Sequence, residues 1–231
     1  MDVEWSKSER YLPGETRCVI TNWADVDELL DLRTELRSQI PGAQPLFVID
    51  DAGQASYTRG HRTQDVGFIG EEDHHEFSAI MVRWLEGENA QDTFEFDEPL
   101  IPIDDASIDL LGHLDDPDRV FVDPLHCWVV ESPDPSMAIA AFPNGYFLGD
   151  LSPAQNYLLA EKLRQTHGLK LFGLGARFAA FCRADPISAD EAKQVVGAVR
   201  HMYAEMTDEL AAQWAEKTAG RRWFLVSYRR A

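Results

Sequence analysis

The sequence predicts an α+β protein in which helices pack on a mostly antiparallel sheet. Residues 143–145 read Pro-Asn-Gly between two apolar runs, and Asn-Gly favours a hairpin because both residues accept a positive φ. Helix starts with capping-box spacing occur at Ser152 and Ser188, each followed three residues later by Gln or Glu. Strand-like runs alternate with these signals, so short turns favour antiparallel pairing of neighbouring strands.

Two helices are predicted in the first half of the chain. The first follows Asn22, has apolar residues near helical spacing, and ends at Pro41-Gly42. The second follows Asp73, which is placed to cap the free backbone N–H groups, and ends at Gly87. Its first turn is rich in acids, which the helix dipole stabilises there.

The second half predicts two further helices. One begins at Ser152, has Pro at its first position, and ends at Gly168. The other is expected as one long helix over 188–219, because its apolar residues keep helical spacing until Gly220.

The predicted strands are short runs rich in β-branched and aromatic residues. They are 17–21, 45–50, 66–69, 93–96, 119–122, 126–131, 137–142, 146–148, 169–174, 177–183 and 222–228.

The domain organisation has two interpretations. Residues 1–231 fold as a single α+β unit, or as an acidic lobe over 1–132 and a second lobe over 133–231. The boundary candidate is the segment 132–136, where two prolines interrupt strand pairing.

Charge is the most informative feature for function. Between Trp84 and Glu161 the chain has 17 acidic residues and one basic residue, Arg119, and the whole chain has a net charge of −19. Such a segment repels nucleic acids and anionic membranes, which are bound through Lys and Arg. It attracts basic proteins over about 8 Å at physiological salt.

The acidity can also arise in two ways that involve no partner. Asp is more frequent than Glu and Arg more frequent than Lys, as in a salt-adapted or GC-rich organism, where such acidity serves solubility alone. Alternatively, residues 151–231 carry a net charge of +4 and could neutralise the first half by packing against it.

The sequence predicts a cytoplasmic protein without a membrane span. Its first residues lack the basic and apolar regions of a secretory signal, and no run of 18 apolar residues occurs. Three widely spaced cysteines, Cys18, Cys127 and Cys182, are expected as reduced, buried thiols.

A metal site is the alternative functional hypothesis. His74 and His75 are adjacent, so they point about 100° apart on a helix, and the H-E-x-x-H spacing is absent. Carboxylates and histidines over 113–126 are of the right types to bind a divalent cation that activates water. The histidine candidates are His61, His74, His113 and His126, which would make the protein a metal-assisted hydrolase or a cation-binding regulatory domain.

No cofactor or catalytic motif is predicted. Gly173-Leu174-Gly175 leads into a strand instead of a helix, which removes the basis for binding phosphate, and no nucleophile elbow or P-loop is present. The favoured interpretation is therefore a non-enzymatic protein that presents an acidic surface to a basic partner, as inhibitors and immunity proteins do. The acids expected to form this surface are Glu86, Glu88, Asp92, Glu95, Asp97, Glu98, Asp104, Asp105, Asp109, Asp115, Asp116 and Asp118.

Overall fold

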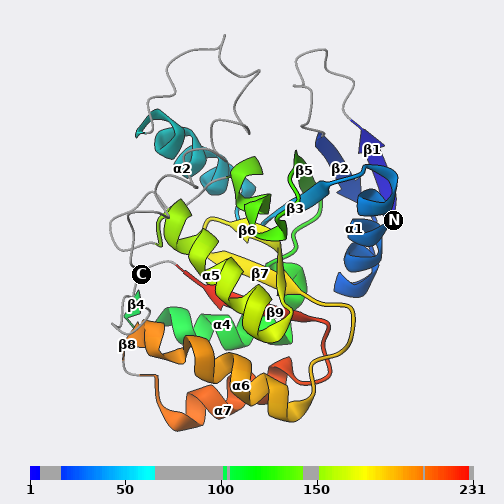
Figure 1. Ribbon diagram of the computed structural model, residues 1–231. Helices are drawn as coiled ribbons and strands as arrows, with labels where there is room; N and C mark the ends of the chain where they lie inside the picture. Colours follow the sequence, from blue (N-terminus) through cyan, green and yellow to red (C-terminus); the bar gives the residue numbers. More distant parts are fainter. Residues whose placement is uncertain (6–16, 66–100, 103–104, 143–150, 205, 229–231) are drawn as a thin grey trace.

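A seven-stranded mixed sheet forms the centre of the molecule in the computed structural model (Figure 1). The structure describes residues 1–5, 17–65, 101–102, 105–142, 151–204 and 206–228. The strands follow the spatial order β1 (Asp2–Trp5), β2 (Arg17–Thr21), β5 (Leu125–Glu131), β3 (Ala43–Ile49), β6 (Lys170–Gly175), β7 (Phe178–Cys182) and β9 (Trp223–Ser227).

Strand pairing confirms the predicted class. In the seven-stranded sheet only β3 and β6 pair in parallel. Every other pair of adjacent strands in this sheet is antiparallel. A separate short parallel pair joins β4 (Ile101–Pro102) to β8 (Tyr203–Ala204). The central sheet therefore contains strands from both halves of the chain.

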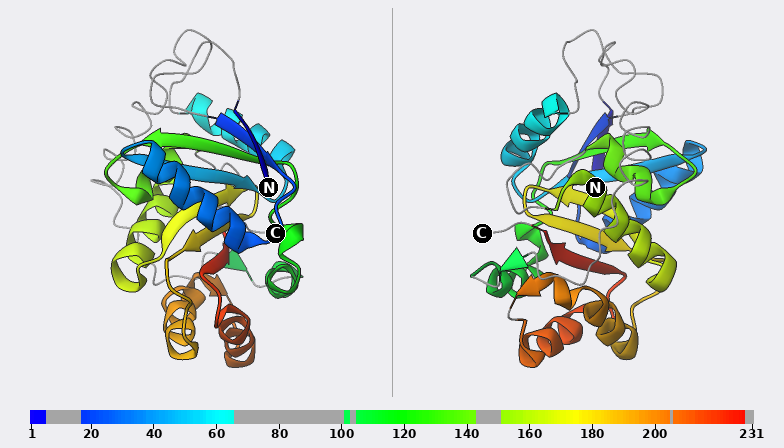
Figure 2. Two further views of the ribbon diagram at one scale, coloured as in Figure 1. Left: turned by 90° about the vertical axis from the view of Figure 1, so that its right-hand side faces the viewer. Right: turned by 60° about the vertical axis from the view of Figure 1, so that its left-hand side comes forward.

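Helices cover both faces of the sheet. α1 (Val26–Gln39) packs on one face, while α5 (Pro153–His167) and the 3-10 helix η3 (Pro135–Ala141) pack on the other (Figure 2). The predicted caps are present: Ser152 and Gln155 form a reciprocal capping box at the start of α5, and Gly168 ends it with a φ of 68°. Only glycine adopts such a φ without strain.

The β9 end of the sheet carries a second group of helices. α4 (Asp105–Asp115), α6 (Ala189–Val199) and α7 (Asp208–Thr218) lie together there (Figures 1 and 2). Trp214 of α7 stacks on Phe224 of β9, with ring centroids 5.2 Å apart. A further helix, α2 (Ala52–Asp65), follows β3.

The single long helix expected over 188–219 is observed as two helices. The 3-10 turn η4 (Arg200–Met202) and β8 separate α6 from α7. Tyr203 is buried and donates a hydrogen bond to the Ser227 carbonyl over 2.7 Å, which draws the chain onto β9. Thr207 then caps a new helix by accepting from the Leu210 N–H. The apolar spacing continued across this break, so periodicity alone did not reveal it.

Two predicted strands are wrong. Over 119–122 the chain forms the end of the 3-10 helix η2 (Pro117–Arg119), and the Pro117 carbonyl accepts from the next two N–H groups, those of Val120 and Phe121. Over 137–142 the chain forms η3, because Asp134 caps the Ser136 N–H and Pro135 begins the turn. Alanine is also a poor strand former.

Several predicted elements cannot be compared with the structure. The expected helix over 73–87, the strands 66–69, 93–96 and 146–148, and the hairpin turn at 143–145 lie outside the described residues.

The core is continuous across the sheet. Phe121 stacks on Phe172 with centroids 5.7 Å apart and meets Trp223 edge to face. Phe47 packs edge to face on the same Phe172. These rings join β3, β6 and β9 into one buried cluster, which fixes the ends of these strands and the side chains that extend from them.

Candidate functional site

Exposed acids without an ion-pair partner occur in the turn after α4. This acid turn, Asp115–Asp118, continues through the exposed Arg119 into the buried residues Val120 and Phe121, which anchor it to the core. Asp115 forms an ion pair with Lys217 of α7. Asp116 and Asp118 are exposed and form no ion pair within the described part of the chain.

The other predicted surface acids are placed less fully. Asp105 and Asp109 belong to α4. The remainder lie outside the described residues: Glu86, Glu88, Asp92, Glu95, Asp97, Glu98 and Asp104.

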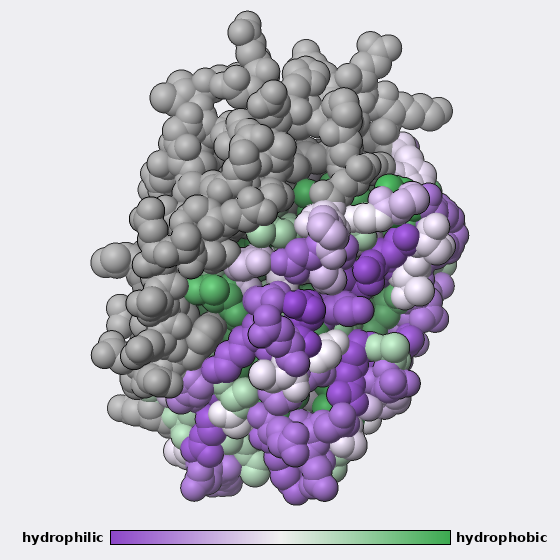
Figure 3. Space-filling view, viewed as in Figure 1, coloured by the Kyte–Doolittle hydropathy of each residue, from purple (hydrophilic) through white to green (hydrophobic). Residues whose placement is uncertain are grey.

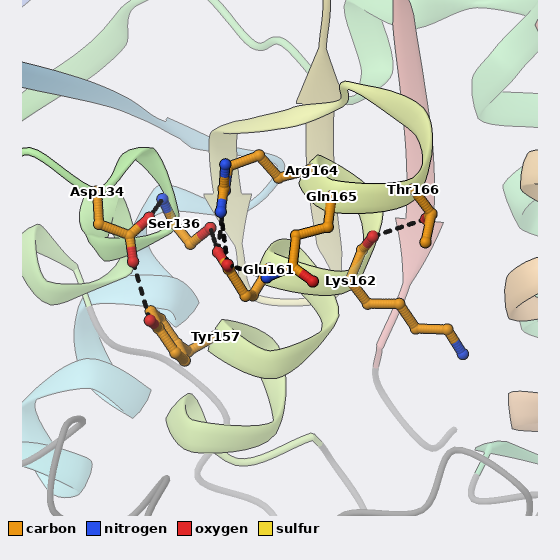
Figure 4. A network of polar contacts seen from close by, with 8 residues as sticks. All are labelled: Asp134, Ser136, Tyr157, Glu161, Lys162, Arg164, Gln165 and Thr166. Carbon is orange, nitrogen blue, oxygen red and sulfur yellow. Dashed lines mark hydrogen bonds and ion pairs between the residues drawn. The ribbon is translucent and has the colours of Figure 1, made fainter.

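Two acids of the same segment are used internally (Figure 4). Asp134 accepts a hydrogen bond from the Tyr157 hydroxyl over 2.9 Å. Glu161 accepts from the Ser136 hydroxyl over 2.9 Å and pairs with Arg164 in the next turn of α5. Arg164 is the main reason that the pKa of Glu161 falls to about 2. These carboxylates hold η3 against α5 and are therefore already partnered.

One arginine of the second half, Arg222, pairs with two acids of α1. Arg222, just before β9, lies 2.8 Å from the Asp27 carboxylate and 3.0 Å from that of Asp31. These two contacts span 195 and 191 positions in the sequence. The internal neutralisation that the charge asymmetry suggested is thus present at α1, whereas Asp116 and Asp118 have no such partner among the described residues.

Asp50 is a third kind of acid, fully enclosed at the carboxyl end of β3. Its carboxylate accepts from the backbone N–H groups of Arg177 (2.9 Å), Phe178 (3.2 Å) and Asp51 (2.5 Å). Burial raises the pKa of Asp50, and these hydrogen bonds and the Arg177 side chain partly offset that rise. A Cβ at Gly175 would lie 2.4 Å from this carboxylate, so only glycine fits beside it.

The role of Asp50 is structural according to this geometry. Its φ of 55° is left-handed, a conformation that Asp and Asn tolerate better than most residues. The carboxylate fixes the turn between β6 and β7 to the end of β3. Sequence patterns did not reveal this contact, because its partners lie 127 and 128 residues further along the chain.

The predicted histidine candidates do not converge in the described residues. His113 is buried in α4, with its ring centroid 4.8 Å from that of Phe178. His126 lies on β5, and His61 belongs to α2. His74 lies outside the described residues. Within the described ranges, no three His, Cys, Asp or Glu side chains are close enough to hold a metal ion.

Two hollows occur in the described surface. One, of about 250 Å³, lies where α2 meets β3 and β5, and its lining consists of Val48, Ala52, Gly53, Ser56, His126 and Trp128. The other, of about 440 Å³, runs between α6 and α7 over alanine and Gly197, with Lys193, Arg200, Asp208 and Glu216 among its charged residues.

The cysteines match the expectation of buried thiols. Cys18 and Cys127 are register partners on β2 and β5, and all three cysteines are free and buried. Burial holds the pKa of the Cys127 and Cys182 thiols above the ordinary value, so both are neutral at physiological pH.

Comparisons with known proteins assign no family. No protein-family model, curated protein or solved structure matches this chain. Among the described helices, none is both long enough and apolar enough to cross a membrane.

Proposed function

We propose that this chain is a non-enzymatic, cytoplasmic interaction protein that presents an acidic surface to a basic protein, in the manner of an inhibitor or immunity protein. The observation that supports the proposal is the pair of exposed carboxylates, Asp116 and Asp118, which lack ion-pair partners in the described part of the chain. They belong to a segment with 17 acids and one base.

The pairing of other acids strengthens this interpretation. Arg222 and Arg164 are engaged with carboxylates elsewhere, and Lys217 pairs with Asp115, so within the acid turn these cations leave Asp116 and Asp118 without an ion pair among the described residues. Hydrophilic side chains cover most of the described surface on one face (Figure 3). Charge complementarity of this kind raises the association rate and selects the partner.

A capture experiment from the source cell tests the proposal. The immobilised protein is incubated with lysate at about 50 mM and about 500 mM salt, conditions between which the Debye length falls from roughly 14 Å to 4 Å. We expect a basic protein that is retained at low salt and released at high salt.

A matched pair of variants locates the contact. Asp116→Asn/Asp118→Asn removes two charges from the acid turn. Asp185→Asn/Asp190→Asn removes the same charge from two exposed acids near the start of α6. We expect capture to weaken about two- to thirtyfold only in the first variant, since rim charges contribute roughly 0.2–1 kcal/mol each and two are removed. Equal capture by both variants, or a captured partner that is not basic, contradicts the proposal.

A further inference from the structure

A cluster of three cations lies between α1 and the start of β6, on an otherwise acidic protein. Arg33 and Arg37 are four residues apart on α1, so they share one helix face. The Arg33 Nη2 donates to the Leu171 carbonyl over 3.3 Å, which places its guanidinium beside the first residues of β6. Lys170 immediately precedes Leu171, and it is the register partner of Cys182 in the pairing of β6 with β7. Arg33, Arg37 and Lys170 together form the cation cluster.

The members of the cluster repel one another. Burial is the largest cause that lowers the pKa of the Arg37 guanidinium, and the positive charge of Arg33 is the next largest. The pKa of Lys170 is likewise lowered by burial and then by Arg37 and Arg33. No carboxylate of the described residues forms an ion pair with any of the three.

Arg33 is the decisive member because it is buried. It is only 4% exposed, and its Nε atom has no hydrogen-bond partner among the described residues. The nearby thiols that feel its charge, those of Cys127 and Cys182, stay neutral because burial raises their pKa. A buried guanidinium with one carbonyl partner costs free energy, and an apolar side chain of similar volume is commonly more stable at such a position. Fold stability therefore does not account for the charge.

We propose that the cation cluster binds a small oxyanion of the phosphate class, either free or carried as a phosphate monoester. Guanidinium groups match the geometry of phosphate oxygens, and a lysine ammonium adds a point charge. Arg37 and Lys170 are half-buried, so an anion can reach them from solvent. Arg33 is buried and adds its positive charge from inside the protein. This site is independent of the acid turn, because it would bind the opposite charge on a different part of the molecule.

Thermal unfolding in phosphate tests the site. Sodium phosphate replaces sodium chloride at constant ionic strength, which keeps charge screening unchanged. Phosphate also stabilises proteins generally by exclusion from their surface, an effect that the variants below share with the wild type. The wild type is expected to gain about 3 °C at a phosphate concentration roughly tenfold above Kd, and the gain is expected to rise with the logarithm of the concentration beyond that point. A second series with methyl phosphate distinguishes the sources: a comparable or larger gain indicates a monoester ligand, and a gain with inorganic phosphate alone indicates the free anion.

Three variants decide the outcome. Arg37→Gln/Lys170→Gln alters half-buried side chains and is expected to fold and to lose this logarithmic gain. Arg33→Met is expected to lose it as well, while its Tm in chloride rises because the unpaired charge is gone. Lys162→Gln/Lys193→Gln removes the same charge elsewhere and is expected to keep the gain. A gain in Arg37→Gln/Lys170→Gln equal to that of the wild type, or no gain in the wild type, overturns the proposal.

Discussion

The acids at the start of α1 and the acids after α4 carry the same charge but have different neighbours. Asp27 and Asp31 share Arg222, which arrives from the far end of the chain. Asp116 and Asp118 are also exposed, and no cation of the described residues pairs with them. The difference shows that acidic residues produce a local negative electrostatic potential only where the fold brings no arginine or lysine close to them. Substitutions that begin at a fully enclosed carboxylate and end at exposed ones test this contrast.

The largest loss of stability is expected from substitution of Asp50, whose carboxylate is fully buried. Asp50→Ala removes the acceptor of three backbone N–H groups, of which that of Phe178 is buried and those of Asp51 and Arg177 are part-buried, and places alanine at a positive φ. We expect the free energy of unfolding to fall by about 2–4 kcal/mol. Asp50→Asn retains a carbonyl oxygen and tolerates the φ, so its loss should be clearly smaller. Urea denaturation measures both, and a loss below about 1 kcal/mol for the alanine variant would show that water replaces the carboxylate.

The next largest effect is expected at Glu161, where the free energy of unfolding should depend on pH. Its folded pKa of about 2 lies below the unfolded value of about 4.3. The stabilisation from its ionised form is therefore fully present above about pH 4.3 and is lost as the pH falls towards 2. We expect Glu161→Gln to be less stable than the wild type at pH 6 by about 1–2 kcal/mol, a value reduced for solvent screening, with the difference shrinking over this window. A difference that stays constant from pH 6 to pH 2.5 would contradict the assignment.

Arg222 provides a smaller effect that links pairing to binding. Arg222→Ala breaks the contacts with Asp27 and Asp31 and should reduce stability by about 0.5–1 kcal/mol, as is usual for partly exposed ion pairs. It also releases two carboxylates, so binding of a polylysine peptide at low salt should become tighter. Unchanged polylysine binding, measured by fluorescence anisotropy, would indicate that these acids are already screened by solvent and salt.

The smallest effect on stability is expected at the acid turn. Asp116→Asn/Asp118→Asn removes no described ion pair, so the free energy of unfolding should change by less than about 0.5 kcal/mol. Added salt is expected to raise the Tm of the wild type by screening repulsion among its acids. This rise should be slightly smaller in the variant, because less self-repulsion remains to be screened. A marked loss of stability in calorimetry would mean that these carboxylates hold the fold together.

Local signals were predictable from the sequence, and distant contacts were not. The capping boxes at Ser152 and Ser188 and the stop at Gly168 depend only on residues within one or two turns, and all three are observed. The break between α6 and α7 depends on the contact of Tyr203 with β9, so helical spacing gave no sign of it. The sequence likewise concealed which acids would be paired, because Arg222 reaches its partners only after folding.

The salt dependence of polylysine binding tests most directly whether the acid turn presents unneutralised charge to a basic partner. We predict that the plot of log Kd against log salt concentration is shallower for Asp116→Asn/Asp118→Asn than for the wild type, and that Asp185→Asn/Asp190→Asn keeps the wild-type slope. Identical slopes for all three proteins would contradict the proposal that the acid turn is a binding surface.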